Sequence, residues 1–382
     1  MTDKKFSDNR IFSPNKVAII TLAVINFVVC CIILNSIYVN HNRAQLRFDQ
    51  QAAERWSGDE TDYAEVSLFT ADDDSLSSSD IKGMESIIYK KLREDADMDT
   101  SSENRMWIDA YSGHLLDEVR KDSTSIKVNV YTVGGDFFQV HPIPLKSGSY
   151  IDMESSDFNQ IVLDENVAWN LFGSSDIVGM KVWIGDSVFT ITGVLEVSEK
   201  KNDIQAYGEY DAVYVPIQAY SKTLTSKDDE EDSFDASKFI SITCYEVVMP
   251  NTVKNYALNA LTEAAGIQVK SDEEKKAERT SLNFGTREVI DNTNRFKLMS
   301  LYKRNKERKY VDMRTNSITY PYWENEARFE EQRQIKVYGL CLILLVVPVL
   351  SLIYVGICIK KKTDAAWNRV MRKLRPRHSQ YV

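Results

Sequence analysis

The sequence contains little of the chemistry that enzymes and metalloproteins use. Only four histidines occur among 382 residues, and none has the spacing of a zinc site or of a nucleophile and its base. They are His41, His114, His141 and His378. Two acidic runs, 72–74 and 228–232, lack the alternating ligands and central glycine of a calcium loop, so we expect solvated loops there. The sequence therefore predicts that the protein is not an enzyme. It offers no catalytic, cofactor-binding or metal-binding residue and calls for no cofactor.

Cysteine is scarce outside two long apolar runs. Four of the five cysteines lie within those runs, which leaves Cys244 alone outside them. One thiol cannot form an intrachain disulfide, so the region between the runs must be stabilised by core packing. Cys244 stands beside Tyr245 in a valine-rich stretch, and we expect it to be a small buried side chain.

A nucleotide-binding loop is also missing. The segment 173–181 contains two glycines and a lysine, but the gap between the glycines is too long and Met180 precedes the lysine. If ATP is involved, a separate subunit must bind it.

Charge is distributed unevenly along the chain. The net charge is −9, yet residues 1–16 and 360–382 are both basic, and the remainder carries 35 basic against 53 acidic residues. Such an acidic surface would repel phosphate backbones, which excludes nucleic-acid binding by this region.

The two apolar runs, Val17–Val39 and Val337–Ile359, contain 23 residues each and no charged residue. A helix of that length extends for about 35 Å and can cross roughly 30 Å of bilayer hydrocarbon. We expect the first run to be an uncleaved anchor, because a signal peptide has a shorter apolar core and a small-residue cleavage site. Pro348 lies in the second run, where a kink is tolerated in a membrane helix.

The basic flanks predict the orientation of the chain. Lysine and arginine precede the first run and follow the second, and such residues are retained on the cytoplasmic side. The sequence therefore predicts a multi-pass membrane protein with both termini in the cytoplasm and residues 40–336 outside it.

The region between the runs reads as a mixture of strands and helices. Residues 64–70 alternate as a strand, and an apolar-periodic helix follows from about Ser79. Further strands are expected at 106–111 and 125–133, and a late strand and helix at 239–248 and 253–265 should pair with the first ones. Other expected elements are strands at 160–163, 181–184 and 187–194, a helix at 165–172 that stops at Gly173, and largely helical stretches at 42–55, 286–308 and 322–336.

A series of short motifs between residues 136 and 216 resembles the MacB-like periplasmic core domain of ABC-transporter permeases. The matching segments are Asp136 to Phe138, Leu145 to Gly148, Val162 to Gly173, Ile177 to Ile184, Phe189 to Val194 and Val213 to Pro216. Their order is preserved over about 80 residues. The glycines in them are interpreted as turn and cap residues rather than as a ligand site.

The resemblance implies an α+β extracytoplasmic domain, in which a split porter-like lobe carries an inserted, mostly β lobe, between two transmembrane helices extended by helical stalks. The predicted order is a cytoplasmic N-terminus (1–16), a transmembrane helix (17–39), a stalk (40–59), the first part of the porter-like lobe (60–139), the inserted lobe (140–236), the second part of the porter-like lobe (237–282), a helical stalk (283–336), a second transmembrane helix (337–359) and a basic cytoplasmic tail (360–382).

The resemblance also implies a function and partners. Permeases of this kind usually have four spans and a cytoplasmic coupling element, whereas here one span and 23 residues follow the outer domain. We therefore expect the membrane subunit of an ABC-type export or mechanotransmission complex, acting with an ABC ATPase and a second permease subunit as a homo- or heterodimer in the lipid bilayer. The basic tail with Trp367 could contact an ATPase or anionic lipid, or act only as a topology signal.

The alternative is a non-transporting, membrane-anchored interaction or regulatory protein. The missing coupling element favours it, while the lysines after the second span speak against a decayed gene fragment. The substrate, the direction of transport and the oligomeric state are not encoded in any motif of the sequence.

Overall fold

The computed structural model describes residues 13–58, 62–95, 106–197, 206, 208–224, 240–251, 253–268, 281–307 and 317–374. The chain divides into two compact units. The first comprises Met1–Gln45 with Arg333–Val382, and the second is Leu46–Gln332. We describe each by itself.

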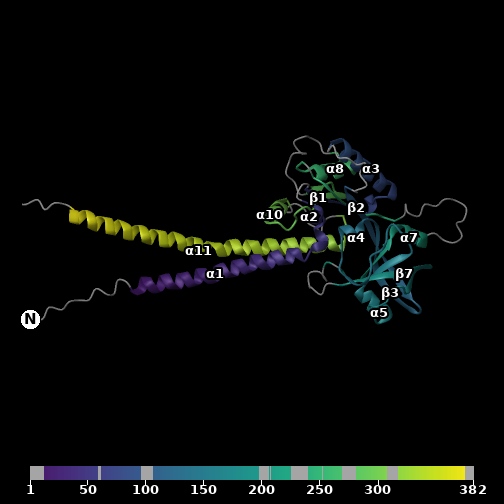
Figure 1. Cartoon of the computed structure of the whole chain (residues 1–382), viewed down its shortest axis with the longest axis horizontal. Helices are drawn as coiled ribbons and strands as arrows, with labels where there is room; N and C mark the ends of the chain where they lie inside the picture. The colour runs from purple at the N-terminus through teal and green to yellow at the C-terminus, as the bar shows by residue number, and fades with distance from the viewer. Residues whose placement is uncertain are drawn as a thin grey trace, which may run out of the picture. The chain divides into compact units, whose positions relative to one another are not determined.

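The first unit contains two long helices, α1 (Ser13–Gln45) and the part of α11 (Tyr322–Leu374) that begins at Arg333. Both are long and apolar enough to cross a membrane (Figure 1), and α11 runs through Pro348 without interruption. They also contact each other: Ser351 Oγ donates to Asn26 Oδ1 over 3.1 Å, and Arg333 Nη1 donates to Asn40 Oδ1 over 3.0 Å. Asn26 and Ser351 lie inside the apolar runs, where polar side chains are stabilised by pairing across the helix interface.

The second unit is built on one mixed sheet. Its eleven strands follow the order β10-β11-β1-β9-β2-β3-β8-β5-β7-β4, with β6 pairing to β2 and β7. Their bounds are β1 Tyr63–Thr70, β2 Ile108–Lys121, β3 Thr124–Gly135, β4 Leu145–Gly148, β5 Gln160–Asp164, β6 Lys181–Ile184, β7 Ser187–Leu195, β8 Ala212–Pro216, β9 Cys244–Pro250, β10 Ser281–Asn283 and β11 Arg287–Asp291. The helical elements are η1 Phe48–Gln50, α2 Ala52–Trp56, η2 Asp72–Asp74, α3 Ser78–Asp95, α4 Phe137–Val140, α5 Glu165–Phe172, α7 Ile217–Leu224, α8 Tyr256–Ala264 and α10 Leu298–Glu307.

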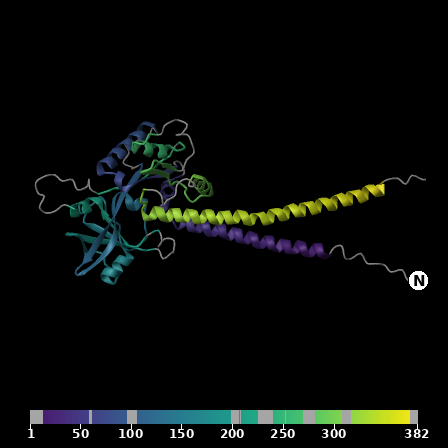
Figure 2. The same cartoon turned by 180° about the vertical axis from the view of Figure 1, so that it is seen from behind.

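The early and late segments pair as expected from the sequence. β1 and β9 are antiparallel neighbours with Val66 opposite Val247, although about 180 residues separate them. Helices α3 and α8 lie side by side over the sheet in both views (Figures 1 and 2) and bury a shared apolar core with it. Helix α3 begins after a capping box, in which Ser77 N donates to Asp80 Oδ2 and Asp80 N donates to Ser77 Oγ. The cap is thus Ser77 rather than Ser79.

The inserted strands β4 to β8 continue the same sheet. The join is the parallel pair β3–β8, and β5–β7 is a second parallel pair. Helix α5 has the predicted bounds and ends at Gly173, whose φ of 69° is the left-handed conformation that suits glycine. The predicted β6–β7 hairpin through Gly185 is present. These elements surround buried aliphatic side chains and Phe189.

Two predicted helical stretches are wrong in part. Residues 283–336 are not helical throughout, because Arg287–Asp291 form strand β11, which pairs with β1. Its place between β10 and β1 lets β11 bury Val289 and Ile290 in the core, and this tertiary gain outweighs helix propensity. Residues 40–59 are not one stalk either, since α1 ends at Gln45 and η1 and α2 follow as separate short turns.

Candidate functional site: a buried charge network

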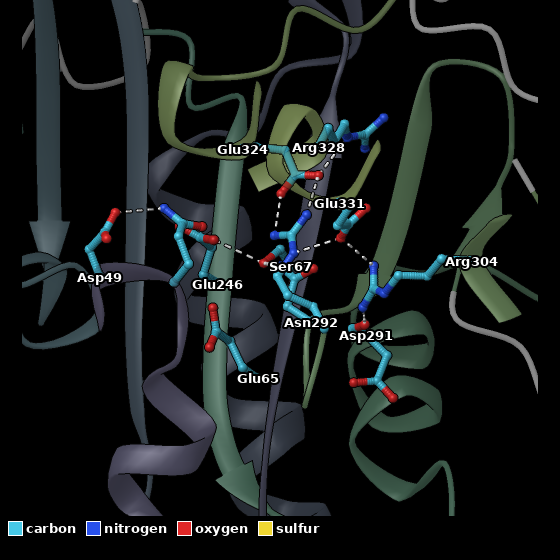
Figure 3. Close-up of polar contacts among 12 residues, drawn as sticks. Asp49, Glu65, Ser67, Glu246, Asp291, Asn292, Arg304, Glu324, Arg328 and Glu331 are labelled. Carbon is cyan, nitrogen blue, oxygen red and sulfur yellow. Dashed lines mark hydrogen bonds and ion pairs between the residues drawn. The ribbon is translucent and has the colours of Figure 1, made fainter. Parts of the chain in front are cut away.

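Polar side chains interrupt the apolar pattern of two central strands. Glu65 and Ser67 of β1 point to the same side, and Ser67 stands opposite Glu246 of β9. Ser67 Oγ donates to Glu246 Oε1 over 2.9 Å and accepts from Asn292 Nδ2 over 2.8 Å. A carboxylate in the middle of a sheet must find partners because its desolvation is costly. Figure 3 shows these groups with the charged residues that surround them.

His141, just after α4, is the cationic partner of Glu246. Its Nε2 lies 2.6 Å from Glu246 Oε2, and its Nδ1 lies 3.0 Å from the carbonyl oxygen of Asp49. Burial alone would lower the pKa of His141, but the charge and hydrogen bond of Glu246 raise it above its ordinary value. Burial opposes ionisation of Glu246 too, yet His141 lowers its pKa. Both shifts indicate an imidazolium–carboxylate pair.

Glu65 lies in the same interior without a cation of its own. Its Oε2 accepts from the backbone N–H groups of Ala52 and Ala53, at 2.8 Å and 3.4 Å, at the start of α2. Burial is the main cause that raises the pKa of Glu65 from 4.5 to about 7, with a further contribution from the charge of Glu246. Glu65 is therefore the group in this interior that can gain or lose a proton near neutral pH.

Arg295 is the centre of the second half of the network. It follows β11, is buried, and donates to two carboxylates of α11: Nε to Glu331 over 2.8 Å, and Nη1 to Glu324 over 2.8 Å. Burial opposes ionisation of Glu324, but the charges of Arg295 and Arg328 outweigh it and lower the pKa of Glu324 to about 2.

Arg328 connects α11 to the edge of the sheet. Its Nε donates to Glu324 Oε1 over 2.5 Å, and its Nη2 donates to Glu288 of β11 over 3.1 Å. Its guanidinium lies 3.8 Å above the ring centre of Tyr320, whose hydroxyl donates to the same Glu288. The planar guanidinium can satisfy these partners at once, which an ammonium could not.

Arg304 attaches helix α10 to the same group. Its Nη1 lies 3.6 Å from Glu331 Oε1, and its Nη2 donates to the carbonyl oxygen of Asp291. Glu331 thus forms ion pairs with two arginines from different parts of the chain, as Figure 3 shows for Arg304.

We define the buried charge network as the nine titratable side chains described above. They are Glu65, His141, Glu246, Glu288, Arg295, Arg304, Glu324, Arg328 and Glu331, and each is at most 3% exposed. Five carboxylates face three guanidinium groups and one imidazolium, so the set balances when one carboxyl is protonated. Burial raises the pKa of Glu65 to about 7, which favours its protonated form.

The network joins segments that are distant in the sequence. Its side chains are buried in this conformation. They join the segment that follows α1 (through Asp49, Ala52 and Ala53) and the first turns of α11 to the central strands β1 and β9. Removing one partner of a buried pair costs roughly 3–5 kcal/mol, so the stability of this connection depends on each partner.

Sequence reasoning missed this network. His141 was expected to be isolated, and the structure corrects this by pairing it with Glu246. Residues 322–336 read as a polar stalk, whereas Trp323, Glu324 and Arg328 are buried in the second unit. The available signal was a charged residue inside each of two strand-like runs, at Glu65 and Glu246. Cys244 is buried as expected, and burial raises the pKa of its thiol.

The family model of the MacB-like periplasmic core domain matches residues 18–260. This match covers more than half of the chain, so the protein belongs to the family of MacB-like periplasmic core domain proteins, a domain of ABC-type transporter permeases. This family is of the permease type and is not a typical enzyme family. The chain is accordingly a membrane-associated protein with an extracytoplasmic mixed α/β domain and two apolar helices.

Solved structures of low sequence identity are also similar to the chain. The periplasmic region of MacB from Actinobacillus actinomycetemcomitans shares 14% identity, with 68% of this chain and 96% of that chain covered and a TM-score of 0.40. The extracellular domain of the noncanonic ABC-type transporter YknZ from Gram-positive bacteria shares 14% identity, with 53% and 96% covered and a TM-score of 0.35. No curated protein matches the chain. The family assignment rests on the family model.

Proposed function

We propose that this protein is the membrane subunit of an ABC-type export or mechanotransmission complex, in which an ABC ATPase and a second permease subunit act with it. In this proposal the chain itself binds no nucleotide. It lies in a bacterial cytoplasmic membrane with both termini inside, and residues 40–336 form the outer domain. That domain consists of a porter-like lobe (60–139 and 237–282) and an inserted lobe (140–236).

The observation that carries the proposal is that the interior of the outer domain is bonded to the chain segment at each of its two ends. The network contacts the segment after α1 through Glu65 and His141, and it contacts α11 through Arg295. A movement of either helix would therefore be passed to the strands β1 and β9, because close-packed interiors transmit strain instead of absorbing it. This double contact supports a transmitting role for the outer domain.

Purification of the tagged protein from its native membranes in mild detergent, followed by mass spectrometry, tests the proposal. We expect an ABC ATPase in stoichiometric amount. A tagged variant without residues 360–382 serves as the comparison, because the basic tail is the segment proposed to lie on the ATPase side. Repeated recovery of envelope proteins without an ATPase would contradict transport and support the non-transporting interaction protein.

The proposed orientation has its own test. Alkaline phosphatase fused after Val382 should be inactive, whereas fusion after Gly173, in the inserted lobe, should be active. The reverse pattern would contradict the orientation derived from the basic flanks.

A further inference from the structure

Helix α10 exposes an apolar face. Leu298, Met299 and Tyr302 are 61%, 66% and 66% exposed, although all three are large apolar or aromatic side chains. At 100° per residue they lie within one arc of the helix. Leu301 and Arg304 lie on the opposite arc and are buried in the second unit. The helix is amphipathic, with its second apolar side directed away from the core.

Basic side chains border this face. Lys297 precedes the helix and Lys306 lies in its last turn, and both are exposed. The apolar centre with a cationic border is the arrangement of helices that lie in the interface of an anionic bilayer, where apolar side chains enter the acyl boundary and lysines reach the phosphates.

Helix α10 contacts α11 shortly before the apolar run of α11 begins. Arg304 lies 3.6 Å from Glu331 of α11, and the uncharged apolar run begins six residues later, at Val337. Since α11 is a continuous helix over this stretch, those six residues rise about 9 Å along its axis. Helix α10 is therefore attached to α11 within two helical turns of the apolar run.

The other chain entrance shows the same feature. Leu46 and Phe48, the first residues after α1, are 64% and 55% exposed. Leu46 and Phe48 thus lie within about ten residues of the apolar run that ends at Val39. A membrane surface is a partner that chain connectivity brings near them.

We propose that α10 is an interfacial helix, which docks on anionic phospholipid through Leu298, Met299 and Tyr302 and through the lysines beside them. This contact supports the buried charge network from outside, because Arg304 on the reverse side of α10 holds Glu331. The inference depends on membrane association alone and is independent of the ATPase proposed above.

Photolabelling of the full-length protein in vesicles tests the inference. The probe is phosphatidylglycerol with a diazirine at the start of its acyl chain, mixed into vesicles of phosphatidylglycerol and phosphatidylethanolamine. We expect strong labelling of the peptide spanning residues 298–303. In phosphatidylcholine vesicles with a phosphatidylcholine probe, labelling should fall roughly ten-fold, because each lysine near an anionic surface adds appreciably to binding.

Variants separate the lipid contact from folding. Leu298→Ser with Met299→Ser and Tyr302→Ser should reduce labelling roughly ten-fold. Trp169→Ser with Val178→Ser and Met180→Ser, a set that is 54%, 48% and 48% exposed in α5 and the loop before β6, should leave it unchanged. If the first variant fails to fold, Lys297→Glu with Lys306→Glu decides, since neither side chain is in the core.

Three results would overturn the inference. The first is labelling of 298–303 equal to that of the peptide containing Trp169, and the second is labelling that neither the serine nor the lysine variants change. The third result is crosslinking of residue 302, replaced by a photoreactive phenylalanine, to a protein instead of to lipid in native membranes.

Discussion

The interior of the second unit is built in two different ways. Around β5, β7 and α5 it consists of side chains such as Ile161, Phe189 and Ile191, which are fully buried and apolar. Between β1, β9 and the start of α11, buried charged side chains lie beside an apolar cluster that includes Phe69, Val248 and Trp323. The apolar region tolerates the exchange of one apolar side chain for another, because its stability depends mainly on the total side-chain volume that fills it. The charged region depends on each partner being present.

The largest effect is expected from Arg295→Ala, which leaves Glu324 and Glu331 buried with fewer cations. Unfolding of the protein in detergent, followed by the fluorescence of its tryptophans, should show a loss of about 3–5 kcal/mol. Arg120→Ala is the matched control, since Arg120 is exposed and lies only over the ring of Trp183. A loss below about 1 kcal/mol, the value of a surface pair, would mean that the network contributes little to stability.

The second effect concerns Glu65 and pH. Its pKa is raised from 4.5 to about 7, so the folded state binds more protons than the unfolded state between those values, and stability must fall as pH rises through this window. At about 1.4 kcal/mol for each pH unit, the free energy of unfolding falls by about 3 kcal/mol across this window, and the loss is complete above about pH 7. His141, whose pKa is also raised, loses its stabilising charge in the same direction.

Glu65→Gln should remove most of this pH dependence, because the amide oxygen can still accept from Ala52 and Ala53. Unfolding curves recorded between pH 5 and 8 measure this pH dependence of the free energy of unfolding. Glu154→Gln, at an exposed position, is the control and should leave the curve unchanged. A Glu65→Gln variant that loses stability at pH 8 would show that the carboxylate is ionised and paired.

A smaller effect is expected in the apolar region. Phe189→Leu keeps an apolar side chain in a fully buried position, and it should cost less than about 1.5 kcal/mol. Chemical denaturation checks it beside Arg295→Lys, an equally conservative exchange that should cost more because lysine cannot serve two carboxylates in a planar fork. Equal losses would remove the difference between the two regions.

The smallest effects concern two glycines. Gly173 ends α5 with φ of 69°, so Gly173→Ala should destabilise the protein by about 1 kcal/mol. Gly83 lies inside α3 with open space around it, so Gly83→Ala should stabilise by about 0.5–1 kcal/mol. Thermal unfolding of both variants shows whether each stabilises or destabilises the protein. A change in the same direction for both would show that backbone conformation is not the deciding factor.

The elements that sequence reasoning predicted well share a local cause. Helix α5 and the β6–β7 hairpin follow from a glycine stop, a tight turn and short apolar runs, all within a few residues. β11 was mistaken for helix because Arg287–Asp291 has no strong local preference, and its pairing with β1 decides its conformation.

The sequence by itself determined the two apolar helices, the family motifs and most of the strands, because length, hydropathy and turn residues act over short distances. Only the tertiary structure decided which charges meet. His141 and Glu246 are 105 residues apart, and Ser67 and Asn292 are 225 residues apart. Each is an ordinary polar residue in its own segment. It becomes part of a buried network only when the sheet brings β1 and β9 beside β11 and α11, because a buried charge is stable only next to its partner.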